Sequence, residues 1–195
     1  ELGAAIPSVA DVYEKAIVLN GLSKTFGLPG LRAGWLVIRD GKVREELIGW
    51  KHYTTICPAA PTEYLAMQAL SVRDQLAERS RQTVRSNFAK CKSFMDHQAA
   101  LFRWRPPIAG STALVEIDLE HLGRKQELAF TTTTEYCHDL AQSHGILLLP
   151  GECLGCSDRF VRIGLGRAGF QQALVAWEAT LPAIPTSRET QGIST

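Results

Sequence analysis

The sequence predicts an α/β fold in the first part of the chain and a smaller α+β unit after about residue 80. Strand-length apolar runs and helical patterns mix throughout, and the later strands are near enough in sequence to pair locally. Of the 195 residues, 45% are hydrophobic and 21% are charged, so the composition is that of a globular protein with material for a core.

In the first part, the expected elements follow from the spacing of the apolar residues. Apolar runs bounded by turn residues predict strands, and a spacing of about 3.6 residues predicts helices. Strands are expected at residues 16–20, buried, and at residues 33–40, ending in a turn at Asp40-Gly41. Helices are expected at residues 43–51, with Leu47 and Ile48 facing inward, and at residues 62–97, as two helices or one with a bend.

In the second part, short strands are expected at residues 102–104, 112–117, 146–151 and 159–167. The tract "TTTTEYCHDLAQSHG" has threonine at its start, which caps a predicted helix that ends at Gly145. The segment "GFQQALVAWEATL" has the apolar spacing of a closing amphipathic helix. Residues 183–195 are polar and have no apolar period, which predicts disorder.

Charge and cysteine content narrow the functional classes. With 21 basic and 20 acidic residues the net charge is +1, which gives no reason to expect nucleic acid or a membrane as a partner. No apolar run approaches the roughly 20 residues that span a bilayer, and we expect no signal peptide at its start. The cysteines form no disulfide framework, so we expect a cytoplasmic protein.

One cysteine pair, Cys153 and Cys156 in "CLGC", has the C-x-x-C spacing. A structural zinc site needs a second pair, which the sequence does not contain, so we expect two small buried residues in a loop. The histidines show no metal-ligand spacing, and no metal site is predicted. Tyr53 is expected either in the core or as a site residue that reaches a partner subunit.

The stretch "NGLSKTFGLPGLRAGW", residues 20–35, holds Lys24 and Arg32 in a turn rich in glycine. It is not a P-loop, because Val18 and Ser23 stand where that motif needs glycine. Lys24 follows a predicted buried strand, where α/β sheets form ligand crevices, and the glycines let the chain bring Arg32 back toward it. An amine that reacts with an aldehyde and a guanidinium that grips a phosphate together point to pyridoxal 5′-phosphate (PLP).

Residues 21–34, "GLSKTFGLPGLRAG", resemble the PLP-lysine signature of the class I/II aminotransferases, the fold-type I group. "KHYTTICPAAPTEYLAMQAL" resembles the segment that leads into the long interdomain helix of that family, and "GILLLPG" with "RFVRIGLGR" resembles its C-terminal domain. The resemblance covers about residues 1–182. It implies the end of the large, mostly parallel-sheet PLP domain in residues 1–80 and the small α+β C-terminal domain in residues 81–182.

Carried over position by position, the resemblance implies that Lys24 forms the internal aldimine with PLP and moves the substrate proton, with Ser23 beside it. Arg32 is implied to bind the cofactor phosphate, and Arg162 to bind the substrate α-carboxylate. Many members have a phosphate-binding Ser or Thr three residues before the lysine, where this chain has Gly21.

Two alternatives concern Arg162. Arg167 competes with it for the substrate, and strand alternation is expected to place the two on opposite faces. A nearby acid such as Asp158 would instead make Arg162 a structural residue paired at the surface.

The resemblance implies a PLP-dependent aminotransferase that acts on an amino acid and a 2-oxo acid and is a homodimer when complete. A lyase, decarboxylase or cyclase of the same fold stays open, as does a PLP-binding sensor domain of a transcription regulator. The family's phosphate loop and its ring-holding residues lie earlier than this chain starts. We therefore expect a C-terminal half that is catalytically inactive alone.

Overall fold

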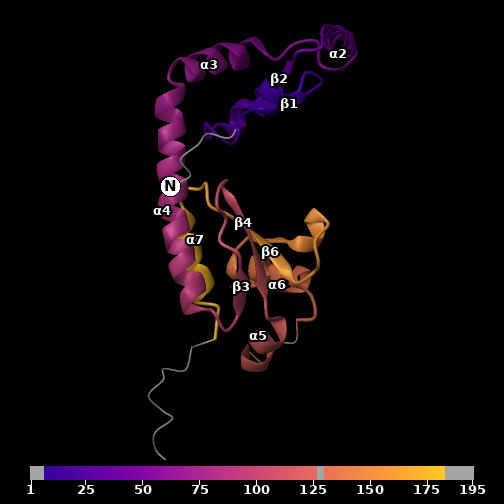
Figure 1. Ribbon diagram of the computed structural model, residues 1–195. Coiled ribbons are helices and arrows are strands. Elements are labelled where there is room, and N and C mark those ends of the chain that lie inside the picture. Colours follow the sequence, from indigo (N-terminus) through magenta and orange to yellow (C-terminus); the bar gives the residue numbers. More distant parts are fainter. Residues whose placement is uncertain (1–6, 127–129, 183–195) are drawn as a thin grey trace, which may run out of the picture. The chain divides into compact units, whose positions relative to one another are not determined.

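The computed structural model describes residues 7–126 and 130–182, and the chain divides into two compact units between Arg81 and Gln82 (Figure 1). The tail for which disorder is predicted, residues 183–195, lies outside the described residues. The long helix α4 (Arg73–His97) contains the division, so its first residues belong to the first unit and the rest to the second.

The first unit contains an antiparallel hairpin of two strands, β1 (Ile17–Gly21) and β2 (Gly34–Ile38). Ile17 lies opposite Ile38 at the open end, and Gly21 lies opposite Gly34 at the closed end. Both predicted strands are therefore confirmed. Among the described residues every strand pairing is antiparallel.

Two glycines at the closed end let the strands of the hairpin approach closely. A Cβ atom on Gly21 would lie 2.9 Å from the carbonyl oxygen of Ala33, and one on Gly34 would lie 2.8 Å from that of Asn20. Just inside the loop, the Leu22 side chain is fully buried, and its backbone N–H donates to Ala33 O at 3.1 Å. The loop that follows β1 is thus closed at its base and anchored by one apolar side chain.

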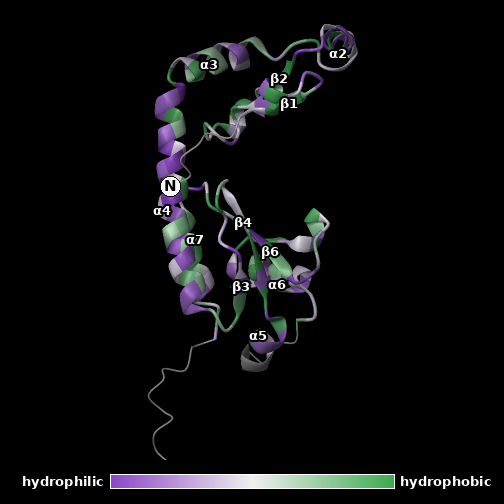
Figure 2. Cartoon of the chain, in the orientation of Figure 1, coloured by the Kyte–Doolittle hydropathy of each residue, from purple (hydrophilic) through white to green (hydrophobic). Residues whose placement is uncertain are grey.

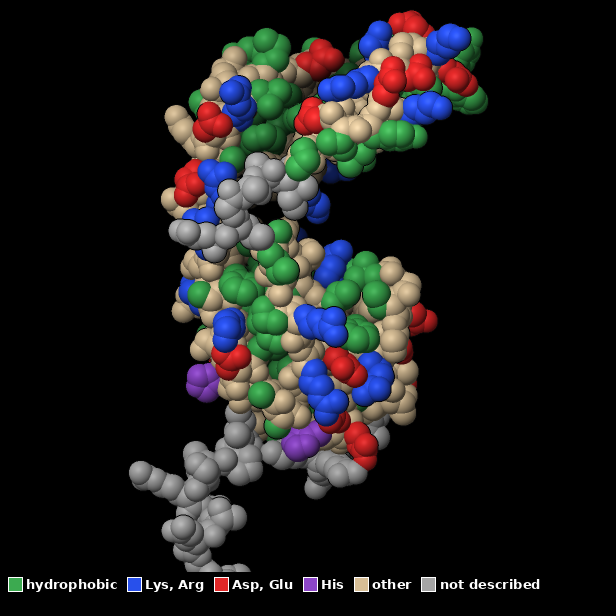
Figure 3. Space-filling view, in the orientation of Figure 1, with side chains coloured by type: hydrophobic (Ala, Val, Ile, Leu, Met, Phe, Trp, Pro, Cys, Tyr) green, Lys and Arg blue, Asp and Glu red, His purple; other side chains and the backbone are tan. Residues whose placement is uncertain are grey.

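The helices of the first unit are α1 (Val9–Val12), α2 (Gly41–Thr54), α3 (Ala60–Ser71) and the start of α4. The predicted turn at Asp40-Gly41 is wrong, because the Asp40 carboxylate accepts from the backbone N–H groups of Lys42 (2.9 Å) and Val43 (3.2 Å) and begins α2. Acidic and basic side chains gather over α2 (Figure 3). The two-helix interpretation of residues 62–97 is confirmed, since the chain breaks at Val72.

Much of the apolar surface of the first unit is exposed. Ile17 and Leu19 in β1 are 54% and 79% exposed, so the prediction of a buried strand is wrong for the described residues. Leu36 and Ile38 lie directly opposite them and therefore on the same face of the hairpin. Ile48, predicted to face inward, is 43% exposed. Further exposed large hydrophobic residues of this unit are Val9, Val12, Tyr13, Val37, Trp50, Tyr53, Ile56, Tyr64, Leu65, Met67 and Val72.

The second unit is built on a four-stranded antiparallel sheet in the order β3-β4-β6-β5. Its strands are β3 (Phe102–Trp104), β4 (Thr112–Ile117), β5 (Leu149–Pro150) and β6 (Phe160–Gly164). The bounds predicted for the first two are confirmed, whereas the two later strands are shorter than predicted. β5 begins at Leu149 rather than at residue 146, and it ends at Pro150 because the chain turns directly into a short 3-10 helix, η2 (Gly151–Leu154).

Three helices complete the second unit: α5 (Leu119–Gln126), α6 (Thr133–His144) and α7 (Phe170–Glu178). The predicted ends of α6 are confirmed, because the Thr132 hydroxyl accepts from Glu135 N at 3.1 Å and Gly145 is left-handed at φ 67°. α5 was not predicted. Its N-terminal signal is the Asp118 carboxylate, which accepts from His121 N at 2.9 Å.

The core of the second unit draws on α4, α5, α6, α7 and one face of the sheet. Phe94, Phe102 and Trp177 pack with ring centroids 5.0 to 5.6 Å apart. The Trp177 indole N–H donates to the buried Tyr136 hydroxyl at 2.7 Å. Every second side chain of β4 and β6 points into this core, so the opposite face of the sheet is left open.

α4 is hydrophilic along much of its length (Figure 2). Its buried residues, Asn87, Cys91, Phe94 and Met95, are confined to the part that belongs to the second unit. None of the helices in the described part of the chain has the length and apolar content that crossing a membrane requires.

Candidate active site

Lys24 lies in the loop that the Gly21–Gly34 pair closes, shortly after β1 ends. Its backbone carbonyl accepts from Gly27 N at 3.2 Å and from Ser80 Oγ on α4 at 3.5 Å. Its side chain is exposed and forms no ion pair with any described residue. The backbone is thus held in place while the ε-amino group stays available to a ligand.

Arg32 ends the same loop in a left-handed backbone conformation, with φ 52° and ψ 33°. That conformation costs a residue other than glycine about 1–2 kcal/mol. It follows a short 3-10 helix, η1 (Pro29–Leu31), and the Arg32 Nη1 donates to Pro29 O at 3.0 Å. The side chain is exposed, and no described carboxylate pairs with it. One loop therefore presents both an amine and a guanidinium.

Two neighbouring positions, Ser23 and Gly21, affect how this loop could bind a phosphate. Ser23 is half-buried directly before Lys24. At Gly21, where many family members have Ser or Thr, an added Cβ would lie 2.9 Å from Ala33 O and 3.1 Å from Gly34 Cα. The strand register thus leaves no room for a side chain at Gly21, which gives a physical reason for the departure from the family signature.

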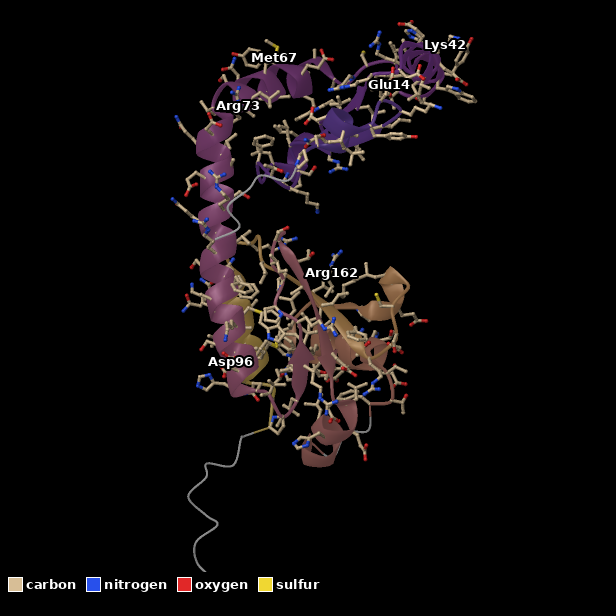
Figure 4. All side chains as sticks on the ribbon, in the orientation of Figure 1. Glu14, Lys42, Met67, Arg73, Asp96 and Arg162 are labelled. Atoms are coloured by element: carbon tan, nitrogen blue, oxygen red, sulfur yellow. The ribbon has the colours of Figure 1, made fainter. Side chains whose placement is uncertain are left out.

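Arg162 lies on β6, between the buried residues Val161 and Ile163, and its own side chain is exposed on the open face of the sheet. Figure 4 labels it there. The anticipated partner Asp158 is occupied elsewhere, since its Oδ1 accepts from the hydroxyls of Thr133 (2.7 Å) and Thr134 (3.3 Å). Arg162 has no ion pair among the described residues, so the surface-pair alternative is wrong for this structure.

Arg167 is also exposed, but strand alternation does not relate it to Arg162. β6 ends at Gly164, so the expectation that the two side chains point to opposite faces rests on a strand longer than the one observed. The loop that carries Arg167 is held by buried Asn87 on α4, whose Nδ2 donates to Leu165 O and Arg167 O, both at 2.8 Å.

Asn87 was not singled out from the sequence. Its signal is a polar residue within the apolar stripe of a helix, between Val84 and Cys91. Such a residue is buried only when it finds hydrogen-bond partners, and here it finds two carbonyls just after β6. Asn87 therefore fixes the exit of the strand that carries Arg162.

Shifted pKa values in the second unit have structural causes. Burial raises the pKa of Tyr136 to about 12, and its hydroxyl accepts from Trp177 within the core. Hydrogen bonds from the backbone and hydroxyl of Thr131 lower the pKa of Glu135.

The Tyr53 side chain is 92% exposed, so the prediction that it lies in the core is wrong for this structure. The expectation that Cys153 and Cys156 are both buried is also wrong, since Cys153 is exposed and Cys156 is half-buried. No group of three or more His, Cys, Asp or Glu in the described ranges is placed to hold a metal ion.

The fold and these residues define the class of protein. The sequence profile of the aminotransferase class I and II family matches residues 2–175. The chain belongs to this family, as the resemblance in its sequence predicted.

Three relatives show how the similarity is distributed. Capreomycidine synthase of Streptomyces vinaceus is 29% identical over 165 residues, which cover 84% of this chain and 39% of the relative. A PLP-dependent aminotransferase from Streptococcus suis has a crystal structure that is 28% identical, with a TM-score of 0.79 over 91% of this chain and 45% of that one. The PLP-dependent cyclase OrfR is 30% identical, with a TM-score of 0.72 over 85% and 42%. The chain thus spans less than half the length of these relatives.

Pyridoxal phosphate is the cofactor that the family and these PLP-dependent structures imply. The chain's own residues fit that group. The exposed amine of Lys24 suits an aldehyde, the exposed guanidinium of Arg32 suits a phosphate, and no described acid neutralises either. The predicted fold class, part of a fold-type I PLP-dependent enzyme, is confirmed by the same structures.

Proposed function

We propose that this chain supplies the cofactor lysine and the substrate-binding arginine of a PLP-dependent aminotransferase, which moves an amino group between an amino acid and a 2-oxo acid. The observation that carries the proposal is the hairpin loop that presents Lys24 and Arg32 together, both exposed and without acid partners among the described residues. Family membership supports it.

Each residue has a defined task in this proposal. Bound PLP would supply an electron sink for the charge left when a bond at the substrate α-carbon breaks. Lys24 Nζ would attach the cofactor and later move the proton at the substrate α-carbon, with Ser23 beside it. Arg32 would hold the phosphate end with paired N–H donors, and Arg162 would orient the substrate by gripping its α-carboxylate with both arms of the guanidinium.

The activity is proposed for the complete protein and not for residues 1–195 alone. The chain covers 45% of the Streptococcus suis structure, and the first unit exposes apolar residues of β1 that need a covering layer. A homodimer and a cytoplasmic location stay predictions, as does the assignment of residues 1–80 and 81–182 to a large and a small domain.

An amino-transfer assay tests the proposal. The complete protein with PLP receives an amino acid carrying a heavy nitrogen isotope and an unlabelled 2-oxo acid, and the label should appear in a new amino acid. Lys24→Ala should lower this rate by about four orders of magnitude or more, the scale for removing a residue that acts directly in the reaction. Lys42→Ala, a matched change in α2, should leave it unchanged.

The cofactor site is tested apart from the reaction. Borohydride reduction of the PLP-loaded protein should leave the pyridoxyl group on the Lys24 peptide after digestion. Recovery of the group on Lys42 or Lys51 would show that the lysine is wrongly assigned.

One relative favours a second function, ring closure, because OrfR is a PLP-dependent cyclase. A cyclase would turn one amino acid into a cyclic product without consuming the 2-oxo acid, so no isotope would pass to a second amino acid. PLP attached to Lys24 with no amino acid consumed would instead favour a sensor domain. The borohydride result is the same for all three. Isotope transfer identifies the aminotransferase, and consumption of the labelled amino acid without transfer separates the cyclase from the sensor domain.

A further inference from the structure

Arg162 lies between two leucines on the open face of the sheet. Leu114 on β4 and Leu149 on β5 are both its register partners, one on each neighbouring strand. Residues directly opposite each other in antiparallel strands point to the same face, with their Cβ atoms about 4.5–5.5 Å apart. The three side chains therefore form one row across the open face.

The two leucines do not serve the core of the second unit. The next row of the sheet consists of Val115, Val161 and Pro150, and all three are buried. Because successive residues of a strand point to opposite faces, the leucine row points away from that core. Leu114 is 42% exposed and Leu149 is half-buried. A role for the pair must therefore come from what it does on the open face.

The leucines suit the shape of the arginine between them. An arginine side chain packs its aliphatic stem along apolar surface and keeps its charged end in water. Leucines on both sides cover the stem of Arg162 and restrict the directions that its guanidinium can take. An arginine that is already ordered loses less conformational entropy when it binds a ligand.

The charges on the open face also leave Arg162 free. The acid on the same face of β4 is Glu116, which lies opposite Phe160 and so is a diagonal neighbour of Arg162. Diagonal neighbours are about 7–8 Å apart, and the Glu116 Oε1 instead lies 3.0 Å from Arg159 Nη2. The positions directly beside Arg162 are thus apolar, and this acid is paired with another arginine.

We propose that Leu114 and Leu149 are positioning residues, which hold the Arg162 guanidinium unpaired and directed away from the sheet, where it receives the carboxylate of the substrate. The inference rests on the proposed function, because it needs Arg162 as the substrate arginine. Neither leucine has to touch the substrate, since both act through the arginine. Apolar neighbours also lower the local dielectric, which strengthens the attraction between the guanidinium and a carboxylate.

Two substitutions of nearly equal shape test the position opposite Arg162 in the complete, PLP-loaded protein. Leu114→Gln removes the apolar flank, so kcat/KM for the amino acid should fall about two- to fivefold, the scale of one cross-strand pair. Leu114→Glu adds a carboxylate that competes with the substrate for Arg162, and its kcat/KM should be about tenfold or more below that of Leu114→Gln. Most of the loss should appear in KM, and PLP titration should be unchanged.

A second background separates this role from a merely structural one. In Arg162→Ala, the difference between glutamine and glutamate at residue 114 should shrink to about twofold or less, because the effect passes through Arg162. Leu149→Glu should repeat the loss from the other side if the variants at residue 114 do not fold. Val175→Glu is the control, since Val175 is 60% exposed on α7, a helix on the core side of the sheet. It should leave kcat/KM unchanged, and far-UV circular dichroism checks the fold of each variant.

Two results would overturn the inference and leave the proposed function standing. One is equal kcat/KM for Leu114→Gln and Leu114→Glu in a protein that loses activity with Arg162→Lys. The other is a penalty for Leu114→Glu that persists in full in the Arg162→Ala background, because the leucine would then act by another route. An unaltered protein that consumes no amino acid would contradict the proposed function itself, and this inference with it.

Discussion

In the second unit, Phe94, Phe102 and Trp177 pack ring against ring around a buried hydrogen bond, whereas in the first unit Ile17 and Leu19 of a central hairpin are exposed. The second unit therefore contains its own core. Among its described hydrophobic residues, the first unit buries only Ala10, Ala16, Leu22 and Ala69. A hairpin with apolar residues on an exposed face is marginal in water unless another layer covers it.

The residues proposed to bind the cofactor and the residue proposed to bind the substrate lie in different units, and only one of these units has a core of its own. Lys24 and Arg32, which would hold the cofactor, belong to the unit that lacks a core. Arg162, which would hold the substrate, belongs to the unit that has one. Cofactor binding should therefore depend on polypeptide beyond the described residues, while the strand of Arg162 should be formed without it.

Hydrogen exchange should show the largest contrast. In residues 1–195 alone, the slowest amides of β4 and β6 should exchange about three orders of magnitude more slowly than those of β1 and β2. The free energy of local opening ranges from near zero to the global stability, about 5–15 kcal/mol. Mass spectrometry of peptides from the two sheets measures these exchange rates. Equal protection of both sheets would show that the two units do not differ in stability.

A pair of matched tryptophan substitutions compares the units at single positions. Trp177→Ala should lower the free energy of unfolding by about 3–5 kcal/mol, the usual cost of removing a large buried aromatic side chain. Trp50, 63% exposed on α2, should cost at most about 0.5 kcal/mol when changed to alanine. Denaturant unfolding monitored by far-UV circular dichroism measures both, and a comparable loss for Trp50→Ala would mean that the first unit has a core of its own.

Arginine-to-lysine changes test where substrate recognition lies. Arg162→Lys in the complete protein should reduce kcat/KM by about two to three orders of magnitude. Lysine lacks the planar fork that would bind the substrate carboxylate, and the loss of a hydrogen-bonded charge pair between binding partners costs about 2–5 kcal/mol. PLP binding should be unchanged. Arg32→Lys should instead weaken PLP retention.

Arg167→Lys is the matched control, since Arg167 is also an exposed arginine in the second unit. Steady-state kinetics and PLP titration on the three variants decide the roles. If Arg167→Lys lost activity while Arg162→Lys kept it, the substrate arginine would be the one in the loop after β6.

Local sequence patterns correctly predicted the strands and helices whose ends are set by neighbouring residues. The bounds of β3 and β4 follow from alternation and a turn, and α6 from a threonine cap and a glycine stop. The loop that groups Lys24 with Arg32 follows from its glycines in the same way. The pairing of these residues on one loop could therefore be predicted before the fold was known.

Predictions failed where the structure depends on residues that are far away in the sequence. The exposure of Ile17 depends on what covers the hairpin, which an apolar run does not reveal. The face of Arg167 depends on where β6 ends, and a pattern of alternation does not mark that end at Gly164. Asn87 binds carbonyls far away in sequence, so its role as a positioning residue appears only in the folded chain.

The smallest expected effect concerns the closed end of the hairpin in the first unit. Gly21→Ser restores the residue type that many family members have there, yet its Cβ would lie 2.9 Å from Ala33 O, a backbone atom that must move. Overpacking of this kind costs about 1–3 kcal/mol, so the variant of the complete protein should melt earlier and bind PLP no more tightly. Gly30→Ser is the control, because a Cβ on Gly30 meets nothing within 4 Å. Thermal unfolding and PLP titration measure both. Tighter PLP binding by Gly21→Ser without loss of stability would show that the hairpin has room for a phosphate ligand and that Arg32 does not carry the phosphate alone.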